Sequence, residues 1–303
     1  MSVPKKLALD IKRNKYVYIM AIPVVAFYFC FSYMPMGGLL IAFQNYSPAR
    51  GIFQSNWVGI KNFVDFIGDY QFTRLLENTI GISVKLIVFG FPAPILLALL
   101  INELHFKYYR KVVQTLSYLP HFISLVVVCG LILDFTSRTG VINQILSNFG
   151  FTPKTFLMQP GMFHGVYVVS DIWQTMGWGS IIYLAAISSI DPGLYEAATI
   201  DGAGRFRQML CVTLPSLLPT IIVLFIMRIG NIMSLGHEKV ILLYNPTVRS
   251  TADIISTFAY RRGLLDSNYG FSTAVSMFNS VINFSILVTV NKLSNKLTSQ
   301  GLW

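Results

Sequence analysis

Six long apolar stretches alternate with shorter polar segments along the chain. A helix that crosses the hydrocarbon core of a bilayer needs about 20 mostly apolar residues. Stretches of at least that length occupy residues 16–43, 78–102, 112–134, 163–190, 214–235 and 271–293. The pattern predicts an all-α fold, a polytopic membrane protein with six transmembrane helices.

If the chain crosses the membrane six times, alternate connecting segments lie on the same side as the N-terminus. Basic residues are concentrated in these segments. Residues 1–15 carry five of them and residues 105–111 read HFKYYRK. Lys and Arg are enriched in cytoplasmic segments of membrane proteins. We therefore expect residues 1–15 to be a cytoplasmic tail, residues 16–303 to form the membrane domain, and both termini to be cytoplasmic. The segments 44–77, 135–162 and 236–270 are then predicted to lie outside.

Composition agrees with a membrane protein. The 303 residues are 54% hydrophobic and 12% charged, with a mean hydropathy of +0.59, whereas soluble domains carry about 25% charged residues. The net charge is +10, which the positive-inside rule explains. No basic helix or aromatic–basic platform indicates nucleic-acid binding. The three cysteines have no paired spacing, so no disulfide framework or metal site is expected.

The segment 191–213, between the fourth and fifth stretches, predicts a pair of short helices. Asp191 can cap a helix whose first position is Pro192. Gly202 is the residue type that ends a helix in a left-handed conformation. A second helix is expected from residue 204 to 212, and the Leu214-Pro215 pair should end it and begin the next span. Two short helices and a tight bend would thus join two spans.

This segment closely resembles the EAA loop of ABC-importer permeases. The resemblance rests on Glu196-Ala197-Ala198, Asp201-Gly202-Ala203, Phe206, Leu214-Pro215 and Pro219. It implies a cytoplasmic coupling helix that docks into a groove on a separate ATPase subunit. The chain itself lacks the G-x-x-x-x-G-K-[ST] phosphate loop. We therefore expect no cofactor here, with ATP and Mg bound by the partner ATPase, in the cytoplasmic (inner) membrane of a bacterium.

The side chains of the loop divide by chemistry. Small residues allow close approach to a partner, Glu196 offers a carboxylate to a partner cation or a helix start, and Phe206 offers an apolar anchor. The bend and the flanking cations complete the predicted coupling surface. Its members are Glu196, Ala197, Ala198, Asp201, Gly202, Ala203, Arg205, Phe206 and Arg207.

Two further segments are similar to the lipoprotein-linked oligosaccharide branch of sugar permeases. They are residues 33–57 (YMPMGGLLIAFQNYSPARGIFQSNW) and 235–263 (LGHEKVILLYNPTVRSTADIISTFAYRRG). The resemblance implies import of an oligosaccharide or polysaccharide fragment. It also implies a second homologous permease, two ATPase subunits and an extracellular solute-binding protein as partners.

Polar residues inside the predicted spans indicate a substrate path, since intramembrane polarity normally faces a cavity or a partner helix. Indoles stack on sugar rings, and Asn, Gln and Arg pair with hydroxyls or carboxylates. In the sixth span Ser272 and Ser280 share a face with three members of the candidate path. The candidates are Trp173, Gln174, Trp178, Arg228, Asn231, Ser276, Asn279 and Asn283. The same groups could instead hydrogen-bond between packed helices.

Other functions remain open at this point. No zinc-binding pattern or serine elbow indicates an enzyme, and no catalytic residue or metal ligand is predicted. Asp134 and Asp171 lie in or beside the spans, as intramembrane acids do in ion-driven secondary transporters, but no internal repeat is visible. The alternatives are such a transporter, an importer of a non-sugar solute, or a membrane scaffold without transport activity.

Overall fold

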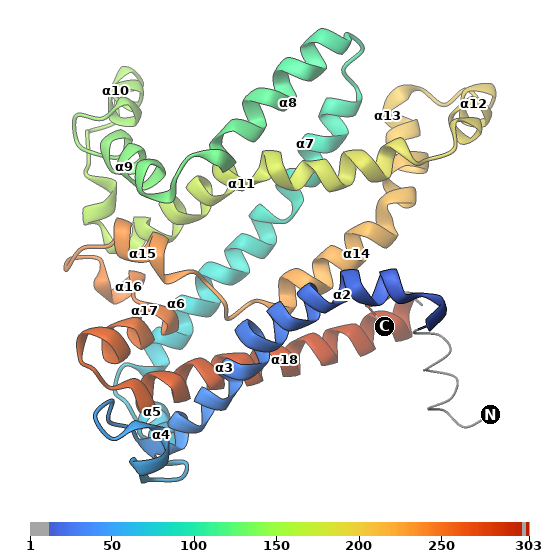
Figure 1. The fold of residues 1–303 in the computed structure, drawn as a ribbon. Coiled ribbons are helices and arrows are strands. Elements are labelled where there is room, and N and C mark those ends of the chain that lie inside the picture. The colour runs from blue at the N-terminus through green and yellow to red at the C-terminus, as the bar shows by residue number, and fades with distance from the viewer. Residues whose placement is uncertain (1–11, 299–300, 303) are drawn as a thin grey trace. The chain divides into compact units, whose positions relative to one another are not determined.

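The computed structural model describes residues 12–298 and 301–302, so most of the predicted cytoplasmic tail lies outside the described residues. Among these residues the only strands are β1 (Gln44–Asn45) and β2 (Asn56–Trp57), which pair antiparallel with Gln44 opposite Trp57. The rest of the ordered structure is helical (Figure 1). The chain divides into two compact units, residues 1–66 with 262–277, and residues 67–261 with 278–303.

The first unit contains the N-terminal span. Its helical run extends from Lys15 to Phe43, 29 residues in all, as the sequence predicts. None of the most apolar window of this run is buried within the chain. The hairpin that follows is held by Asn62, whose amide donates to the carbonyls of Ala42 and Gln44. The elements of this unit are α2 (Lys15–Tyr28), η1 (Phe29–Tyr33), α3 (Met34–Met36), η2 (Gly37–Phe43), β1, α4 (Gly51–Gln54) and β2; α5 (Lys61–Ile67), η7 (Arg261–Leu265) and α18 (Tyr269–Thr298) belong to both units.

The second unit carries the remaining helices, and α11 is its longest element outside α18. Figure 1 shows α9, α10 and α15 near one end of α11, and α12 and α13 near the other. The elements are α6 (Phe72–Lys85), η3 (Leu86–Gly90), α7 (Pro92–Asn102), α8 (Lys107–Phe122), α9 (Leu125–Phe135), α10 (Val141–Asn148), η4 (Phe156–Met158), η5 (Pro160–Met162), α11 (Phe163–Ser188), α12 (Pro192–Ile200), α13 (Arg205–Gln208), η6 (Met209–Thr213), α14 (Leu214–Gly230), α15 (His237–Leu243), α16 (Arg249–Ala252) and α17 (Ile255–Tyr260).

Three of the prolines inside helical runs each follow a π-helical turn. The turns η1, η3 and η6 end two residues before Pro35, Pro92 and Pro215, respectively. Proline has no N–H to donate and its ring clashes with the carbonyl four residues earlier. A wider turn relieves that clash, and π-bulges are a recognised cause of helix kinks. The helices therefore continue through these prolines, and the Phe72–Asn102 run spans 31 residues.

The third predicted span is not a single helix, so that prediction is wrong as drawn. α8 and α9 are joined at a sharp bend of 101°. Pro120 lies in the last turn of α8, Ile123 is extended, and the Ser124 hydroxyl accepts from the Val127 N–H to cap α9. A backbone that leaves helical geometry for two residues and is capped anew starts a separate helix.

Close packing around α11 forms the core of the second unit. A Cβ at Gly177 would clash with the backbone carbonyl of Ser117 in α8, so only glycine permits this helix contact. One hydrophobic cluster joins α6, α9 and α11 to α15, with Val240 and Leu243 fully buried. A second cluster joins α7, α11 and α14.

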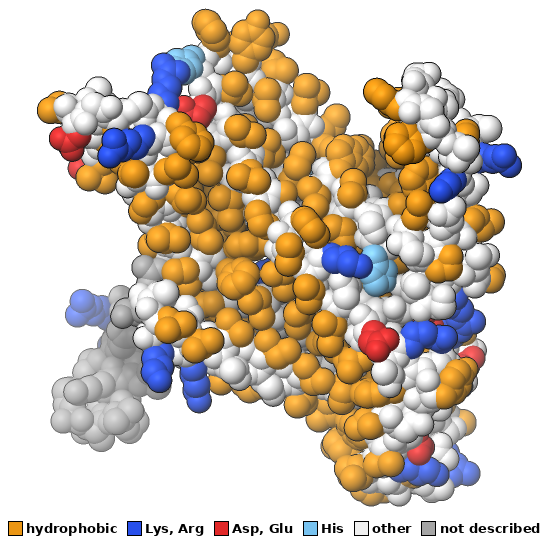
Figure 2. All heavy atoms as spheres, turned by 180° about the vertical axis from the view of Figure 1, so that it is seen from behind, with side chains coloured by type: hydrophobic (Ala, Val, Ile, Leu, Met, Phe, Trp, Pro, Cys, Tyr) orange, Lys and Arg blue, Asp and Glu red, His pale blue; other side chains and the backbone are white. Residues whose placement is uncertain are grey.

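The segment 236–270 is therefore more than the outer loop that the sequence predicts. It folds into three short helices, and α15 contributes to the core of the second unit. Lys239 of this segment is also buried, with an exposed fraction of 5%. Many large apolar side chains are nevertheless exposed, and Figure 2 shows them spread over one face among backbone and polar groups.

Within the described residues, four helical runs and the bent α8–α9 pair have the length and hydropathy to cross a membrane. α11 has 26 residues but carries His164, Asp171 and Gln174, and it is not among them. The chain is thus a helical membrane protein with several membrane-competent helices.

Candidate coupling surface and substrate path

The segment 191–213 begins with the local geometry that its residues predict. The Asp191 carboxylate accepts from the Gly193 N–H at 2.9 Å, and Pro192 is the first residue of α12. Gly202 has φ = +75° and its N–H donates to the Thr199 carbonyl at 3.0 Å. The N–H of Ala203 donates to the Ala198 carbonyl at 2.9 Å. These bonds end α12 in the left-handed turn that only glycine adopts without strain.

The second predicted helix of this segment does not end at Leu214. α13, η6 and α14 form one run of 26 residues from Arg205 to Gly230. The π turn at Met209–Thr213 accommodates Pro215, so the proline widens the helix without terminating it. The bend at Gly202 is thus connected directly to this membrane-competent run.

Two side chains that the sequence did not single out hold the bend together. The Gln208 amide donates to the Thr199 hydroxyl and to the Ala203 carbonyl, both at 2.9 Å. The Tyr195 hydroxyl lies 2.9 Å from the Thr213 hydroxyl and links α12 to η6. Gln208 and Tyr195 act through residues that the bend places opposite them. The periodicity of the sequence does not identify such partners.

Most predicted coupling residues lie on the surface. Two of them, Ala198 and Ala203, are half-buried. The exposed ones are Glu196, Ala197, Asp201, Gly202, Arg205, Phe206 and Arg207. Phe206 is 71% exposed and the neighbouring Ile200 is 87% exposed. The loop therefore presents two large apolar side chains beside two carboxylates and two cations, a composition suited to docking on another protein.

The loop at 191–204 lies beside the short connection between α7 and α8. Arg205 Nη1 is 3.3 Å from His105 Nδ1. Glu103, Tyr195 and Gln208 are among the residues that line a hollow of about 250 Å³ between the two segments. Both segments are predicted to be cytoplasmic, and the fold places them at the same end of the second unit. Arg205 is engaged within the chain, whereas Arg207 projects from the surface.

The structure does not bring the three candidates of the fourth span together. Trp178 stacks on His121, with ring centroids 4.7 Å apart, and meets Phe122 edge-on. Trp173 borders an open apolar hollow of about 720 Å³ that Leu131 and Phe135 also line. Gln174 lies half-buried between them in the chain. The two indoles point to different faces of α11 because five helical residues turn through about 140° beyond a full circle.

The polar face of the sixth span serves in part as a packing seam. Asn283 is 9% exposed, accepts from the Met233 N–H at 2.9 Å and donates to the Ser234 hydroxyl at 2.7 Å. These bonds secure the turn after α14 against α18. Asn279 has a buried Oδ1 without a hydrogen-bond partner among the described residues. Ser276 is exposed on α18.

α14 ends at Gly230, so Asn231 lies beyond the helix that carries Arg228. Asn231 is the residue after the last turn, and its amide donates to the Met227 carbonyl at 2.9 Å. It therefore caps the helix C-terminus. Arg228 is exposed in the last turn of α14.

A buried ion pair that the sequence did not predict connects α11 to α15. Lys239 Nζ lies 3.3 Å from Asp171 Oδ1 and 5.0 Å from the centroid of the Tyr167 ring. Burial lowers the pKa of Lys239, and the adjacent Asp171 opposes that shift. The residues are 68 positions apart in the chain, so only the packing of α15 into the core brings them together.

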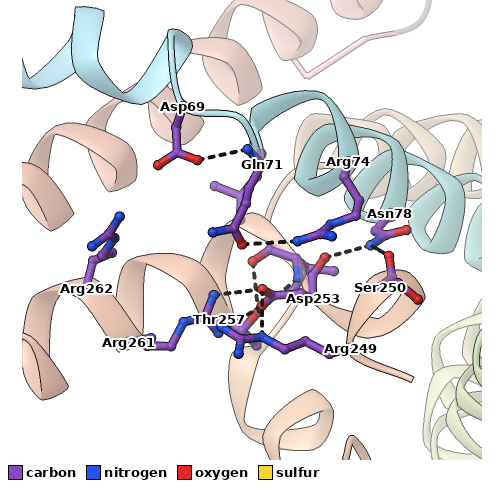
Figure 3. A network of polar contacts seen from close by, with 12 residues as sticks. Asp69, Gln71, Arg74, Asn78, Arg249, Ser250, Asp253, Thr257, Arg261 and Arg262 are labelled. Atoms are coloured by element: carbon purple, nitrogen blue, oxygen red, sulfur yellow. Dashed lines mark hydrogen bonds and ion pairs between the residues drawn. The ribbon is translucent and has the colours of Figure 1, made fainter. Parts of the chain in front are cut away.

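A second polar network anchors the segment after α15 to α6 (Figure 3). The Asp253 carboxylate is fully buried and accepts from both terminal nitrogens of Arg261, at 3.3 and 2.7 Å. Thr257 donates to the same carboxylate at 2.6 Å. The Asn78 amide of α6 donates to the Asp253 carbonyl at 2.9 Å. Burial alone would lower the pKa of Arg261, but Asp253 raises it.

Comparison with known proteins decides the family. Residues 90–298 match the binding-protein-dependent transport system inner membrane component. The chain belongs to this family of transport permeases. The family is not one of enzymes, and it favours the importer interpretation over an ion-driven secondary transporter, so Asp171 is explained by its pairing with Lys239.

Relatives and solved structures cover nearly the whole chain. Protein LplB of Bacillus subtilis (strain 168) is 42% identical over 97% of this chain and 92% of its own length. The polygalacturonan/rhamnogalacturonan transport system permease protein YteP of the same organism is 41% identical over 99% of this chain and 94% of its own length. A chain of a bacterial alginate ABC transporter, crystallised with an alginate pentasaccharide-bound periplasmic protein, is 45% identical with a TM-score of 0.89. That match covers 98% of this chain and 100% of the other.

Proposed function

We propose that the chain is a permease subunit of an ABC importer that moves an oligosaccharide or polysaccharide fragment into the cell. The observation that carries the proposal is the similarity, over nearly all of the chain, to a permease of an alginate importer and to a polygalacturonan/rhamnogalacturonan permease. The sequence has no nucleotide-binding motif, so ATP and Mg²⁺ are proposed to bind on a separate ATPase.

The proposed assembly contains three kinds of partner protein. A second homologous permease completes the path, two ATPase subunits supply energy, and an extracellular solute-binding protein delivers the saccharide. Docking of the ATPase at residues 191–213 is supported by the exposed Ile200 and Phe206 and by the rigid attachment of this loop to the Arg205–Gly230 run. A shift of the loop would thereby act on the fifth span.

Uptake by the reconstituted transporter tests this function. The full chain is purified with the partner permease, the ATPase and the binding protein, and the complex is placed in proteoliposomes. We expect ATP-dependent accumulation of labelled oligosaccharides such as tetragalacturonate. Accumulation that follows an imposed ion gradient without ATP, or no saccharide uptake at all, would contradict the proposal.

The proposed topology has six spans, with both termini in the cytoplasm and α11 as the fourth span. In a background with Cys30, Cys129 and Cys211 replaced by Ala, we expect cysteines introduced at Ser2 and Ser299 to resist an impermeant thiol reagent in intact cells. A cysteine at the exposed Asn268 should react. Reaction at either terminus before permeabilisation would refute the six-span arrangement.

A further inference from the structure

Three cations lie on helices that contact α11. Lys85 of α6 contacts His164, and Lys239 of α15 contacts Asp171. Arg228 lies in the last turn of α14, a helix that also packs against α11. Asp171 is the single acid of this group and it is paired with Lys239, so two positive charges are left over.

The hydrogen bonds around His164 define what Lys85 can still bind. His164 Nε2 lies 2.8 Å from the Thr251 carbonyl oxygen, which only accepts, so Nε2 carries the proton. His164 Nδ1 is then the acceptor for the Lys85 ammonium at 2.9 Å. A lysine has three N–H donors, and two remain for another ligand. The imidazole thus orients the ammonium without neutralising it.

Both cations lie in membrane-competent helices and are exposed on the surface of the chain. Lys85 is near the middle of the Phe72–Asn102 run, and Arg228 is in the last turn of the Arg205–Gly230 run. Within residues 12–298 and 301–302, neither forms an ion pair with an acid of this chain. Charged groups in membrane segments face a cavity or a charged partner, since contact with lipid is costly. An anion is therefore needed to complete this region.

We propose that Lys85 and Arg228 bind carboxylates of an acidic saccharide, such as an oligouronate, as it passes through the transporter. The inference rests on the proposed function and narrows its substrate class. A polyuronate carries a carboxylate on every sugar, so it can meet two separated cations in turn. Hydrogen bonds between a charged donor and a carboxylate are stronger than neutral ones, whereas a neutral sugar would leave both charges uncompensated. Alginate and polygalacturonan, for which two relatives of this chain are named as transporters, are polyanions of this kind.

Transport of tetragalacturonate and tetramannuronate by the reconstituted complex tests the site. The wild type should import at least one of these two acidic saccharides. Lys85→Met and Arg228→Met should each lower its uptake by about tenfold, which corresponds to the free energy of one charge-assisted hydrogen bond. Lys85→Arg keeps the charge and should retain most uptake. Lys154→Met removes an exposed lysine of a loop and is the matched control. Uptake is compared at saturating saccharide and binding protein, with basal ATPase activity and co-purification of the second permease as assembly controls.

The outcomes separate the two proposals. Unchanged uptake in both methionine variants overturns the carboxylate site. Loss of the second permease from Lys85→Met, but not from Lys154→Met, also overturns it, because the cation would then pair with an acid of that subunit. A wild type that imports neutral oligosaccharides and neither acid refutes the inference while leaving the proposed function intact. A wild type that imports no saccharide refutes the proposed function itself.

Discussion

The Gly202→Val variant is expected to assemble normally but to lose saccharide-stimulated ATP hydrolysis. Gly202 has φ = +75°, a conformation that costs an ordinary residue about 1–2 kcal/mol and a β-branched residue more. No atom lies within 4 Å of the site of an added Cβ, so the backbone conformation alone is disturbed. Valine would therefore shift α12 relative to the Arg205–Gly230 run. We expect the stimulated rate to fall at least about tenfold, since about 1.4 kcal/mol corresponds to that factor.

The same substitution two residues later is the control. Gly204 has φ = −68° and ψ = 167°, which valine adopts readily, and it also faces open space. Gly204→Val should keep normal stimulation, and Gly202→Asn should recover part of it because Asn tolerates the left-handed region. ATPase activity of the purified complex with and without liganded binding protein is the measurement. Equal stimulation in Gly202→Val and Gly204→Val would show that the bend does not couple the subunits.

The Asp253→Asn variant is expected to destabilise the second unit strongly. Its carboxylate is fully buried, binds Arg261 through two hydrogen bonds and accepts from Thr257. Removal of one member of a buried ion pair costs about 3–5 kcal/mol, because the remaining charge is left uncompensated. We expect the midpoint of thermal unfolding of the purified complex to fall by roughly 10 °C, since each kcal/mol shifts it by about 2–4 °C.

An exposed ion pair provides the comparison for this effect. Arg262 and Asp266 are 3.6 Å apart with side chains 42% and 50% exposed, and such pairs contribute at most about 1 kcal/mol. Asp266→Asn should therefore change the midpoint little. Adding Arg261→Met to Asp253→Asn should restore part of the loss by removing the unpaired charge. If Asp253→Asn unfolds at the wild-type temperature, the network does not anchor this segment.

The two units differ in how far local pattern predicts them. The first helical run matches the apolar stretch 16–43 to within one residue. None of its most apolar window is buried against the rest of the chain, so length and hydropathy alone are enough to predict this helix. In the second unit, the break between α8 and α9 follows from Ile123 and Ser124 leaving helical geometry. The stretch 112–134 has one proline and only scattered polar residues among its apolar ones. It therefore reads as a continuous span, and the bend was not predicted.

The candidate site divides in the same way. Asp191, Pro192 and Gly202 act through their own backbone geometry, and their roles in starting and ending α12 were predicted. Gln208 and Tyr195 act through partners on the other side of the bend, and they were missed. Asn283, which the sequence places in the candidate substrate path, hydrogen-bonds to the turn at Met233 and Ser234, and its helical spacing did not reveal these partners.

The sequence by itself determined the class of protein, the positions of most helices and the bend between α12 and the fifth span. These features depend on hydropathy, length and the conformational limits of proline and glycine, which act within a few residues. Only the tertiary structure decided which polar groups meet: Lys239 with Asp171, Asp253 with Arg261 and Asn78, and Lys85 with His164. Most of these pairs join residues far apart in the chain, and even Asp253 is buried only by the packing of α16 and α17 on α6. Electrostatic and hydrogen-bonded partners are therefore set by helix packing, and no periodicity along the chain records that packing.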